Sequence, residues 1–183
     1  GNIISYDTSG NPVAVATGSS GQVLTSAGAG AVPSFQASAV GGKIGQVTFS
    51  DQTIQFSTTA SGYVDTGIGV TITPSSSNSK IAVWFGVNFN KRSTAGNWFG
   101  TLYRAISGGA TNQVVGGRGL VSSNGQASYS FIHQQSFSYL DSPNTTSAVT
   151  YRLYTMVEGG SGTVHTSYDP NTHSSCMAME VLA

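Results

Sequence analysis

The amino-acid sequence predicts an all-β protein, an antiparallel β-sandwich of the jelly-roll type preceded by an extended N-terminal segment. Short runs of alternating apolar and polar residues are separated by turn signals rich in Gly, Pro and Asn. No stretch keeps the ~3.6-residue apolar period of an amphipathic helix. Composition agrees, because Gly (24 of 183 residues), Ser, Thr and aromatic residues (10%) favour strands and turns over helices.

The strand pattern occupies residues 43–183, which we interpret as one sandwich domain. Its clearest strand is residues 80–90, where strict alternation predicts a core-facing row of Ile81, Val83, Phe85, Val87 and Phe89. Residues 46–50 and 53–57 are expected to pair with each other around Ser50 to Gln52. The other predicted strands are residues 64–72, 98–106, 113–121, 129–140, 149–157, 163–168 and 176–182.

Residues 1–42 differ from the rest, since they contain no Lys or Arg and only one acid, Asp7. Clusters of small residues alternate there with short apolar patches, none long enough to form a sheet core alone. We interpret this segment as a thin shaft in which the patches of several chains bury each other. A flexible Gly/Ser linker is the alternative that the composition leaves open.

Charge excludes several function classes. The chain has seven Lys plus Arg and seven Asp plus Glu, a net charge of zero and only 8% charged residues. A nucleic-acid partner is not expected, because such proteins cluster Lys and Arg against the phosphates. Membrane insertion is not expected either, since no apolar run is long enough. The lack of an initial Met and of a signal-peptide pattern reads as the cut end of a longer chain.

Two predicted strands are apolar on both faces. In residues 176–182, Met177 and Met179 alternate with Cys176 and Ala178, and residues 129–140 likewise carry large apolar side chains on both sides. A strand of this kind is either buried between layers or placed at a subunit interface. This pattern predicts an oligomer.

Two parts of the sequence resemble bacteriophage fibre proteins. The first is Gly21-Gln22-Val23-Leu24-Thr25-Ser26 followed by Pro33-Ser34-Phe35, which is similar to a segment of tail-fibre proteins. The second resembles the opening and closing strands of fibre head domains, at residues 64–74, 79–81 and 179–181. Such heads resemble trimeric jelly rolls of the C1q and tumour-necrosis-factor type. The resemblance therefore implies a homotrimer with an N-terminal shaft and a C-terminal head.

The sequence predicts no catalytic residue, cofactor or metal. It lacks the phosphate-binding loop, the serine nucleophile elbow and the His-Glu-x-x-His zinc motif. Its acids are isolated in sequence, whereas glycan cleavage needs two neighbouring carboxylates. The spacing of His165 and His173 matches no standard metal site. We therefore expect a binding protein rather than an enzyme.

Two predicted loops carry the candidate receptor-binding residues, because aromatic rings beside polar groups suit a sugar surface. The first loop contributes Lys91, Arg92, Asn97 and Trp98, and the second contributes His165, Tyr168, Asp169 and Asn171. The alternative is that both loops are merely solvated, with Trp98 and Tyr168 filling the core.

These observations favour a component of the virion surface, a homotrimeric fibre whose head attaches to a bacterial surface receptor such as a glycan. Its N-terminal side would join other virion proteins. A purely structural appendage of the capsid, collar or tail, without receptor binding, is the main alternative. A glycan hydrolase is a distant third.

Overall fold

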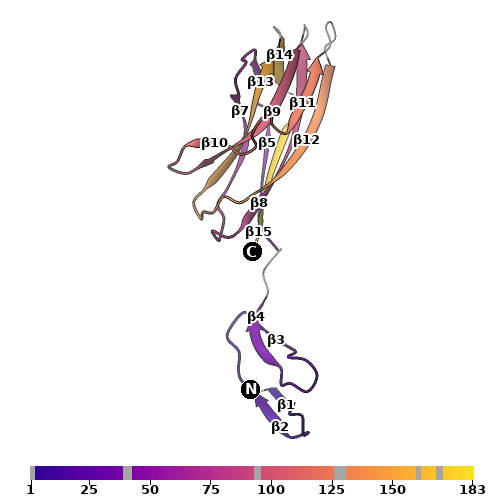
Figure 1. Cartoon of the computed structure of the whole chain (residues 1–183), viewed down its shortest axis with the longest axis vertical. Helices are drawn as coiled ribbons and strands as arrows, with labels where there is room; N and C mark the ends of the chain where they lie inside the picture. Colours follow the sequence, from indigo (N-terminus) through magenta and orange to yellow (C-terminus); the bar gives the residue numbers. More distant parts are fainter. Residues whose placement is uncertain (1–2, 39–42, 93–95, 126–130, 160–161, 168–170) are drawn as a thin grey trace. The chain divides into compact units, whose positions relative to one another are not determined.

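The computed structural model describes the chain except for residues 1–2, 39–42, 93–95, 126–130, 160–161 and 168–170 (Figure 1). The described residues form strands and turns, and none of their segments is a helix that could cross a membrane. The chain divides into two compact units, Gly1–Gly41 and Gly42–Ala183. These units differ by one residue from the predicted ranges 1–42 and 43–183.

The N-terminal unit consists of two antiparallel ribbons. Strand β1 (Ile3–Tyr6) pairs with β2 (Pro12–Val15), and β3 (Gln22–Thr25) pairs with β4 (Ser34–Ala37). At the first turn, the Asp7 carboxylate accepts hydrogen bonds from the backbone N–H groups of Ser9 and Asn11, both at 2.8 Å. The segment predicted as extended therefore contains short paired strands. Packing of its apolar patches against other chains stays a prediction.

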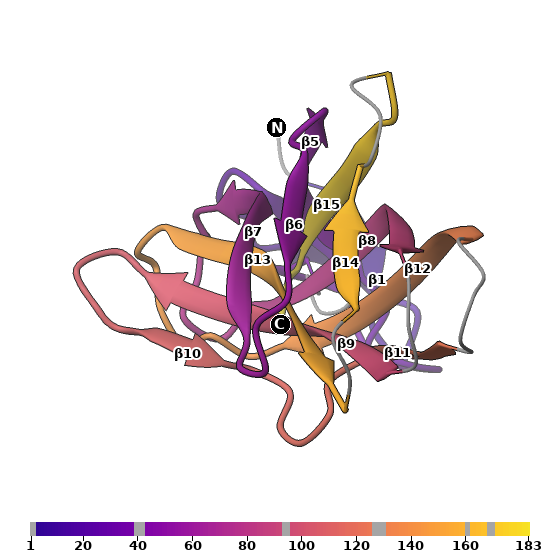
Figure 2. The same ribbon diagram turned by 90° about the horizontal axis from the view of Figure 1, so that it is seen from above.

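The C-terminal unit contains two antiparallel sheets (Figure 2). The five-stranded sheet has the order β10-β9-β13-β7, with β11 also paired to β9. Its strands are β7 (Val64–Ile72), β9 (Gly96–Ile106), β10 (Thr111–Gln113), β11 (Val121–Gly125) and β13 (Val149–Glu158). The prediction of an all-β antiparallel sandwich is confirmed.

The six-stranded sheet has the order β5-β15-β8-β14-β6, with β12 paired to the other edge of β8. Its strands are β5 (Ile44–Gln52), β6 (Phe56–Thr58), β8 (Lys80–Arg92), β12 (Phe131–Asp141), β14 (Thr163–Thr166) and β15 (Ser174–Val181). One edge of β8 pairs with β15 over residues 80–86 and then with β14 over residues 89–92. Two successive strands thus share one long partner.

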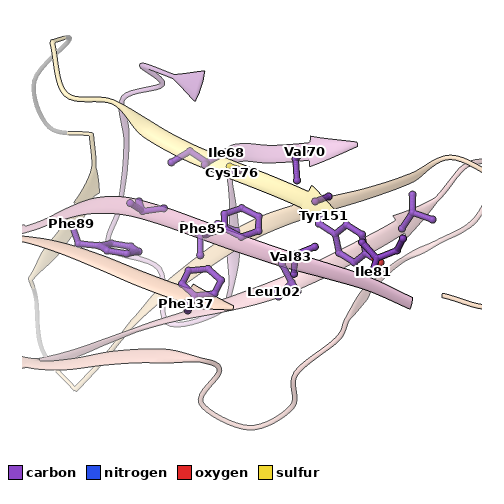
Figure 3. Close-up of a cluster of buried hydrophobic side chains, with 14 of the residues drawn as sticks. Ile68, Val70, Ile81, Val83, Phe85, Phe89, Leu102, Phe137, Tyr151 and Cys176 are labelled. Atoms are coloured by element: carbon purple, nitrogen blue, oxygen red, sulfur yellow. The ribbon is translucent and has the colours of Figure 1, made fainter. Parts of the chain in front are cut away.

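The hydrophobic core lies between the two sheets (Figure 3). The predicted row on β8 is confirmed, since all five side chains are at most 1% exposed. The rings of Phe85 and Phe137 stack with their centroids 5.1 Å apart. Burying large side chains of this kind contributes ~1.5–3 kcal/mol each, so this row supplies much of the energy that joins the sheets.

A polar bridge also links the sheets. Asp141 at the end of β12 is 6% exposed, and its carboxylate accepts hydrogen bonds from Arg104 Nη1 at 2.8 and 2.9 Å. The Tyr151 hydroxyl donates to the same carboxylate at 2.7 Å. Burial and this bond to Asp141 raise the pKa of Tyr151. The buried charge is thereby paired, as its desolvation requires.

Two strand predictions are wrong. Residues 46–50 and 53–57 do not pair with each other, because β5 pairs with β15 and β6 pairs with β14. Residues 113–121 do not form one strand, because β10 ends at Gln113 and β11 starts at Val121. Between them, Gly117 and Gly119 adopt positive φ angles of 67° and 82°, which lie outside the extended conformation of regular strands.

Candidate functional site

The structure places five of the eight predicted receptor-binding residues on strands rather than in loops, and Asn97 and Trp98 are the two that lie on β9. Lys91 and Arg92 end β8, and His165 lies within β14. The register pairs His165 with Asn90 and Lys91 with Val164. The two predicted segments therefore meet at one end of the six-stranded sheet, although not as loop tips.

Trp98 corrects the sequence-based site. Its side chain is 1% exposed and stacks on Phe89 with ring centroids 4.2 Å apart. The prediction that Trp98 offers its ring to a sugar is wrong, because this residue lies on the face of β9 that packs against β8. Its neighbour Asn97 is half-buried and lies opposite Glu158. The alternative, in which Trp98 fills the core, describes the structure.

The second predicted segment is anchored at both ends. The hydroxyls of Ser167 and Ser174 lie 2.7 Å apart, and the Ser167 N–H donates to the Asn88 carbonyl at 2.9 Å. Asn171 is exposed. Tyr168 and Asp169 lie outside the described residues, so their roles stay predictions.

The described carboxylates of this unit each have a separate partner. The contacts are Asp51–His173 (2.8 Å), Asp65–Arg152 (2.9 Å), Asp141–Arg104 (2.8 Å), Glu158–Arg118 (2.9 Å) and Glu180–Ser75 (2.7 Å). Within the described residues, no group of three or more His, Cys, Asp and Glu gathers as a metal site would need. Each carboxylate is therefore engaged separately by its own partner.

A different cluster lies on the outer face of the five-stranded sheet, and we name it the tyrosine platform: Tyr63, Asp65, Tyr103, Arg152 and Tyr154. The register places Arg152 opposite Tyr103, and Tyr154 opposite Asp65. The rings of Tyr103 and Tyr154 stack with centroids 3.9 Å apart, and Tyr63 meets Tyr103 edge-on at 6.2 Å. Three aromatic rings from three segments therefore form one surface.

A shallow cavity of about 210 Å³ opens beside these rings. Besides Asp65, Tyr103, Arg152 and Tyr154, its lining consists of Ala105, Thr111 and Thr150. Arg152 extends across Gly69, where a Cβ atom would lie 2.9 Å from the Arg152 Cγ, and its Nη1 donates to Asp65 Oδ2 at 2.9 Å. Gly69 thus provides the space in which Arg152 reaches the acid.

Burial, followed by the charge of Asp65, raises the pKa of Tyr154. Burial is also the main cause that raises the pKa of Tyr63. Both phenols therefore keep their protons at neutral pH and remain hydrogen-bond donors. The platform combines apolar ring surface with hydroxyl, guanidinium and carboxylate groups.

Sequence reasoning missed this platform. The alternation in residues 149–157 already places Thr150, Arg152 and Tyr154 on the outward face of a predicted strand. What the sequence does not reveal is that β9 and β7 flank this strand. Their order in the sheet brings Tyr103 and Asp65 beside Arg152.

Part of the outer face of the six-stranded sheet is apolar. Met177 lies between Phe49 and Trp84 in the register, and Met179 lies between Val47 and Ala82, with Leu140 next to Ala82. Phe49 is 64% exposed, and Val47 and Leu140 are 52% exposed. An open hollow of about 540 Å³ lies on this face. We name it the apolar face: Val47, Phe49, Ala82, Trp84, Leu140, Met177 and Met179.

The fold and these surfaces define the class of the chain: an antiparallel β-sandwich unit that carries one aromatic-polar and one apolar outer face. No protein-family model matches the sequence, and no curated protein is significantly similar to it.

Among solved structures, the chain is similar to the infectious bursal disease virus Gx strain structure, with 12% identity and a TM-score of 0.35. It is also similar to the VP2 protein of that virus in derived T=1 particles, with 14% identity and a TM-score of 0.35. The matches cover 94% of this chain but only 43% and 42% of those chains, so this chain spans less than half of their length. Both TM-scores lie below 0.5, so the likeness carries no implication for function.

Proposed function

We propose that this chain is a virion fibre protein whose C-terminal unit forms a homotrimeric head and attaches to a bacterial surface. The apolar face carries this proposal. Large apolar side chains lie there on four adjacent strands of one sheet, and none of the residues that line the hollow on this face is charged. Contiguous exposed surface of this kind is typical of an interaction site.

The composition of the apolar face favours other copies of this chain as its partner. Its Trp, Phe and Met residues are of the types enriched at interface cores, from which charged residues are depleted. The indole of Trp84 lies over Gly86, where a Cβ atom would be 2.7 Å from the ring. Trp84 therefore lies along the sheet and leaves the face low enough for close packing.

Burying about 500 Å² of apolar surface per subunit would contribute ~12 kcal/mol before the costs of association. The resemblance to bacteriophage fibres adds the threefold state and the N-terminal link to other virion proteins. In this proposal the head is a binding module rather than an enzyme. Three weak receptor sites would act together through their high effective concentration.

Oligomeric state tests the first part. We expect a trimer for the full chain in size-exclusion chromatography with light scattering, and a monomer for the double variant Phe49→Asp, Leu140→Asp. Both positions are exposed, so the variant should fold, which circular dichroism checks. Thr71→Asp is the matched control, because it adds a charge to the outer face of the other sheet. A wild-type chain that stays monomeric at micromolar concentration would reject the trimer.

Cell binding tests the second part. The fluorescently labelled chain should bind some members of a panel of bacterial strains. A trimer that binds neither cells nor glycans would favour the alternative, a structural appendage of the virion. Shortening of a capsular polysaccharide during incubation would instead support a hydrolase.

A further inference from the structure

We propose that the tyrosine platform binds a neutral saccharide of the bacterial surface. This inference rests on the proposed attachment function and names the ligand class and the residues. The sequence pointed to Trp98 as the aromatic binding residue, but Trp98 lies in the core. Tyr103 and Tyr154 instead line an open cavity.

The rings provide the apolar part of such a site. Tyr103 and Tyr154 are half-buried and line the cavity together. Sugar rings have apolar faces of C–H groups, which pack on aromatic side chains, while a tyrosine keeps its hydroxyl for a polar contact. The stack of Tyr103 on Tyr154 at 3.9 Å holds both rings in place. Such preorganisation lowers the entropic cost of binding.

The polar side chains of the platform are arranged to bind two neighbouring hydroxyl groups of a sugar. A sugar hydroxyl both donates and accepts, so a pair of them needs an acceptor and a donor side by side. Asp65 and Arg152 supply this pair in one fixed geometry, because Asp65 Oδ2 accepts from Arg152 Nη1 at 2.9 Å and Asp65 Oδ1 accepts from the Gly67 N–H at 2.8 Å. Thr111 and Thr150 add hydroxyls that can donate or accept.

Charge favours a neutral ligand over an anionic one. Among the residues that line the cavity, the guanidinium of Arg152 is already paired with the carboxylate of Asp65. A phosphate or a sugar acid would have to approach that carboxylate. The volume of about 210 Å³ lies below the ~300–1,000 Å³ of pockets that bury drug-sized ligands. The platform therefore suits one sugar unit within a surface polysaccharide.

The position of the platform agrees with trimerisation. It lies on the outer face of the five-stranded sheet, whereas the apolar face belongs to the six-stranded sheet. Packing of copies through the apolar face would leave each platform accessible, and each trimer would present three.

A glycan array of neutral and anionic bacterial polysaccharides, probed with the full chain, tests the inference. We expect binding to at least one neutral polysaccharide. Tyr154→Ala should weaken it by roughly tenfold, the loss typical of removing one stacking ring. Arg152→Met should also weaken it by roughly tenfold, because it removes a charged hydrogen-bond donor. Tyr154→Phe should retain most of the affinity, because it keeps the ring. Tyr6→Ala is the matched control, since Tyr6 is an exposed tyrosine of the N-terminal unit.

Three results would overturn the inference: no binding to any neutral polysaccharide, binding to anionic polymers only, or equal binding by Tyr154→Ala, Arg152→Met and the wild type. Unchanged melting temperatures verify that the variants fold. Bacterial cells separate this inference from the proposed function. If the chain binds cells and Arg152→Met binds them equally well, the platform fails while attachment stands. If the chain binds neutral polysaccharide through the platform but no cells, attachment fails while the platform stands.

Discussion

The outer faces of the two sheets differ although the same alternating pattern builds both. On the six-stranded sheet, outward positions are occupied by Phe49, Trp84 and Met177. On the five-stranded sheet, they are occupied by Tyr103, Arg152 and Tyr154. Alternation only requires that one side of each strand be apolar. The opposite side is free to become an association surface on one sheet and a polar, aromatic surface on the other.

The largest loss of stability is expected for a residue on the inner face of a sheet, compared with one on an outer face. Trp98→Ala is expected to lower the free energy of unfolding by about 3–5 kcal/mol, because it removes a fully buried ring that packs on Phe89. Trp84→Ala should cost less than half as much, since Trp84 is only half-buried on the apolar face. Urea denaturation measures both losses in the Phe49→Asp, Leu140→Asp background, in which the proposed subunit interface does not form. Equal losses would contradict the assignment of Trp98 to the core.

The next effect concerns Glu180, which points inward on β15 beside the outward-facing Met179. Burial alone would raise the pKa of Glu180, but hydrogen bonds from Gln46 and Ser75 outweigh it and lower the pKa from 4.5 to about 2. A carboxyl group whose pKa is lower in the folded than in the unfolded state stabilises the fold at pH values above its unfolded-state pKa. This contribution, roughly 3 kcal/mol, should therefore disappear as the pH falls from about 4.5 towards 2.

Denaturant midpoints measured across this pH range check the prediction. Glu180→Gln should remove most of the acid-dependent part, because an amide does not titrate. An unchanged pH profile in that variant would assign the acid sensitivity to other carboxylates.

A smaller loss of stability is expected where the segment between β10 and β11 packs closely against β9. Gly119 has a φ angle of 82°, and a Cβ atom there would lie 2.4 Å from the Gly100 carbonyl oxygen. Gly119→Ala should therefore destabilise the unit by about 2 kcal/mol. It should also loosen the contact between Arg118 and the Phe99 ring, 5.1 Å from its centroid. Thermal unfolding of this variant beside Gly116→Ala, where a Cβ atom meets open space, provides the comparison.

The smallest effect on stability is expected at the tyrosine platform. Arg152→Met breaks an ion pair whose side chains are 46% and 34% exposed, and exposed pairs contribute only ~0–1 kcal/mol. The denaturation midpoint should hardly change. A large loss of stability would mean that Arg152 serves the fold rather than a ligand.

Much of the fold was predictable where the pattern is local. Strict alternation from Ile81 to Phe89 identifies β8 and its buried face, because a strand positions its own side chains. The pairing of β5 and β6 was mispredicted because neighbours in sequence are only the default partners. Here β14 and β15, which follow much later in the chain, separate both strands from β8.

The candidate site was less predictable than the fold. Trp98 beside Lys91 and Arg92 resembles a loop site in sequence, but the alternation that starts β9 turns its ring inward. The platform depends on Asp65, Tyr103 and Arg152, which come from three strands. Only the sheet order brings them together, and a single sequence contains no direct record of that order.

The position of β15 affects how the head is made. This strand, Ser174–Val181, lies between β5 and β8 in the interior of its sheet. During synthesis, β5 and β8 therefore leave the ribosome long before the strand that joins them. Contacts between such distant segments slow folding and expose strand edges in the meantime. The sandwich is completed only after residue 181 has emerged, so this unit cannot fold strand by strand as it is synthesised.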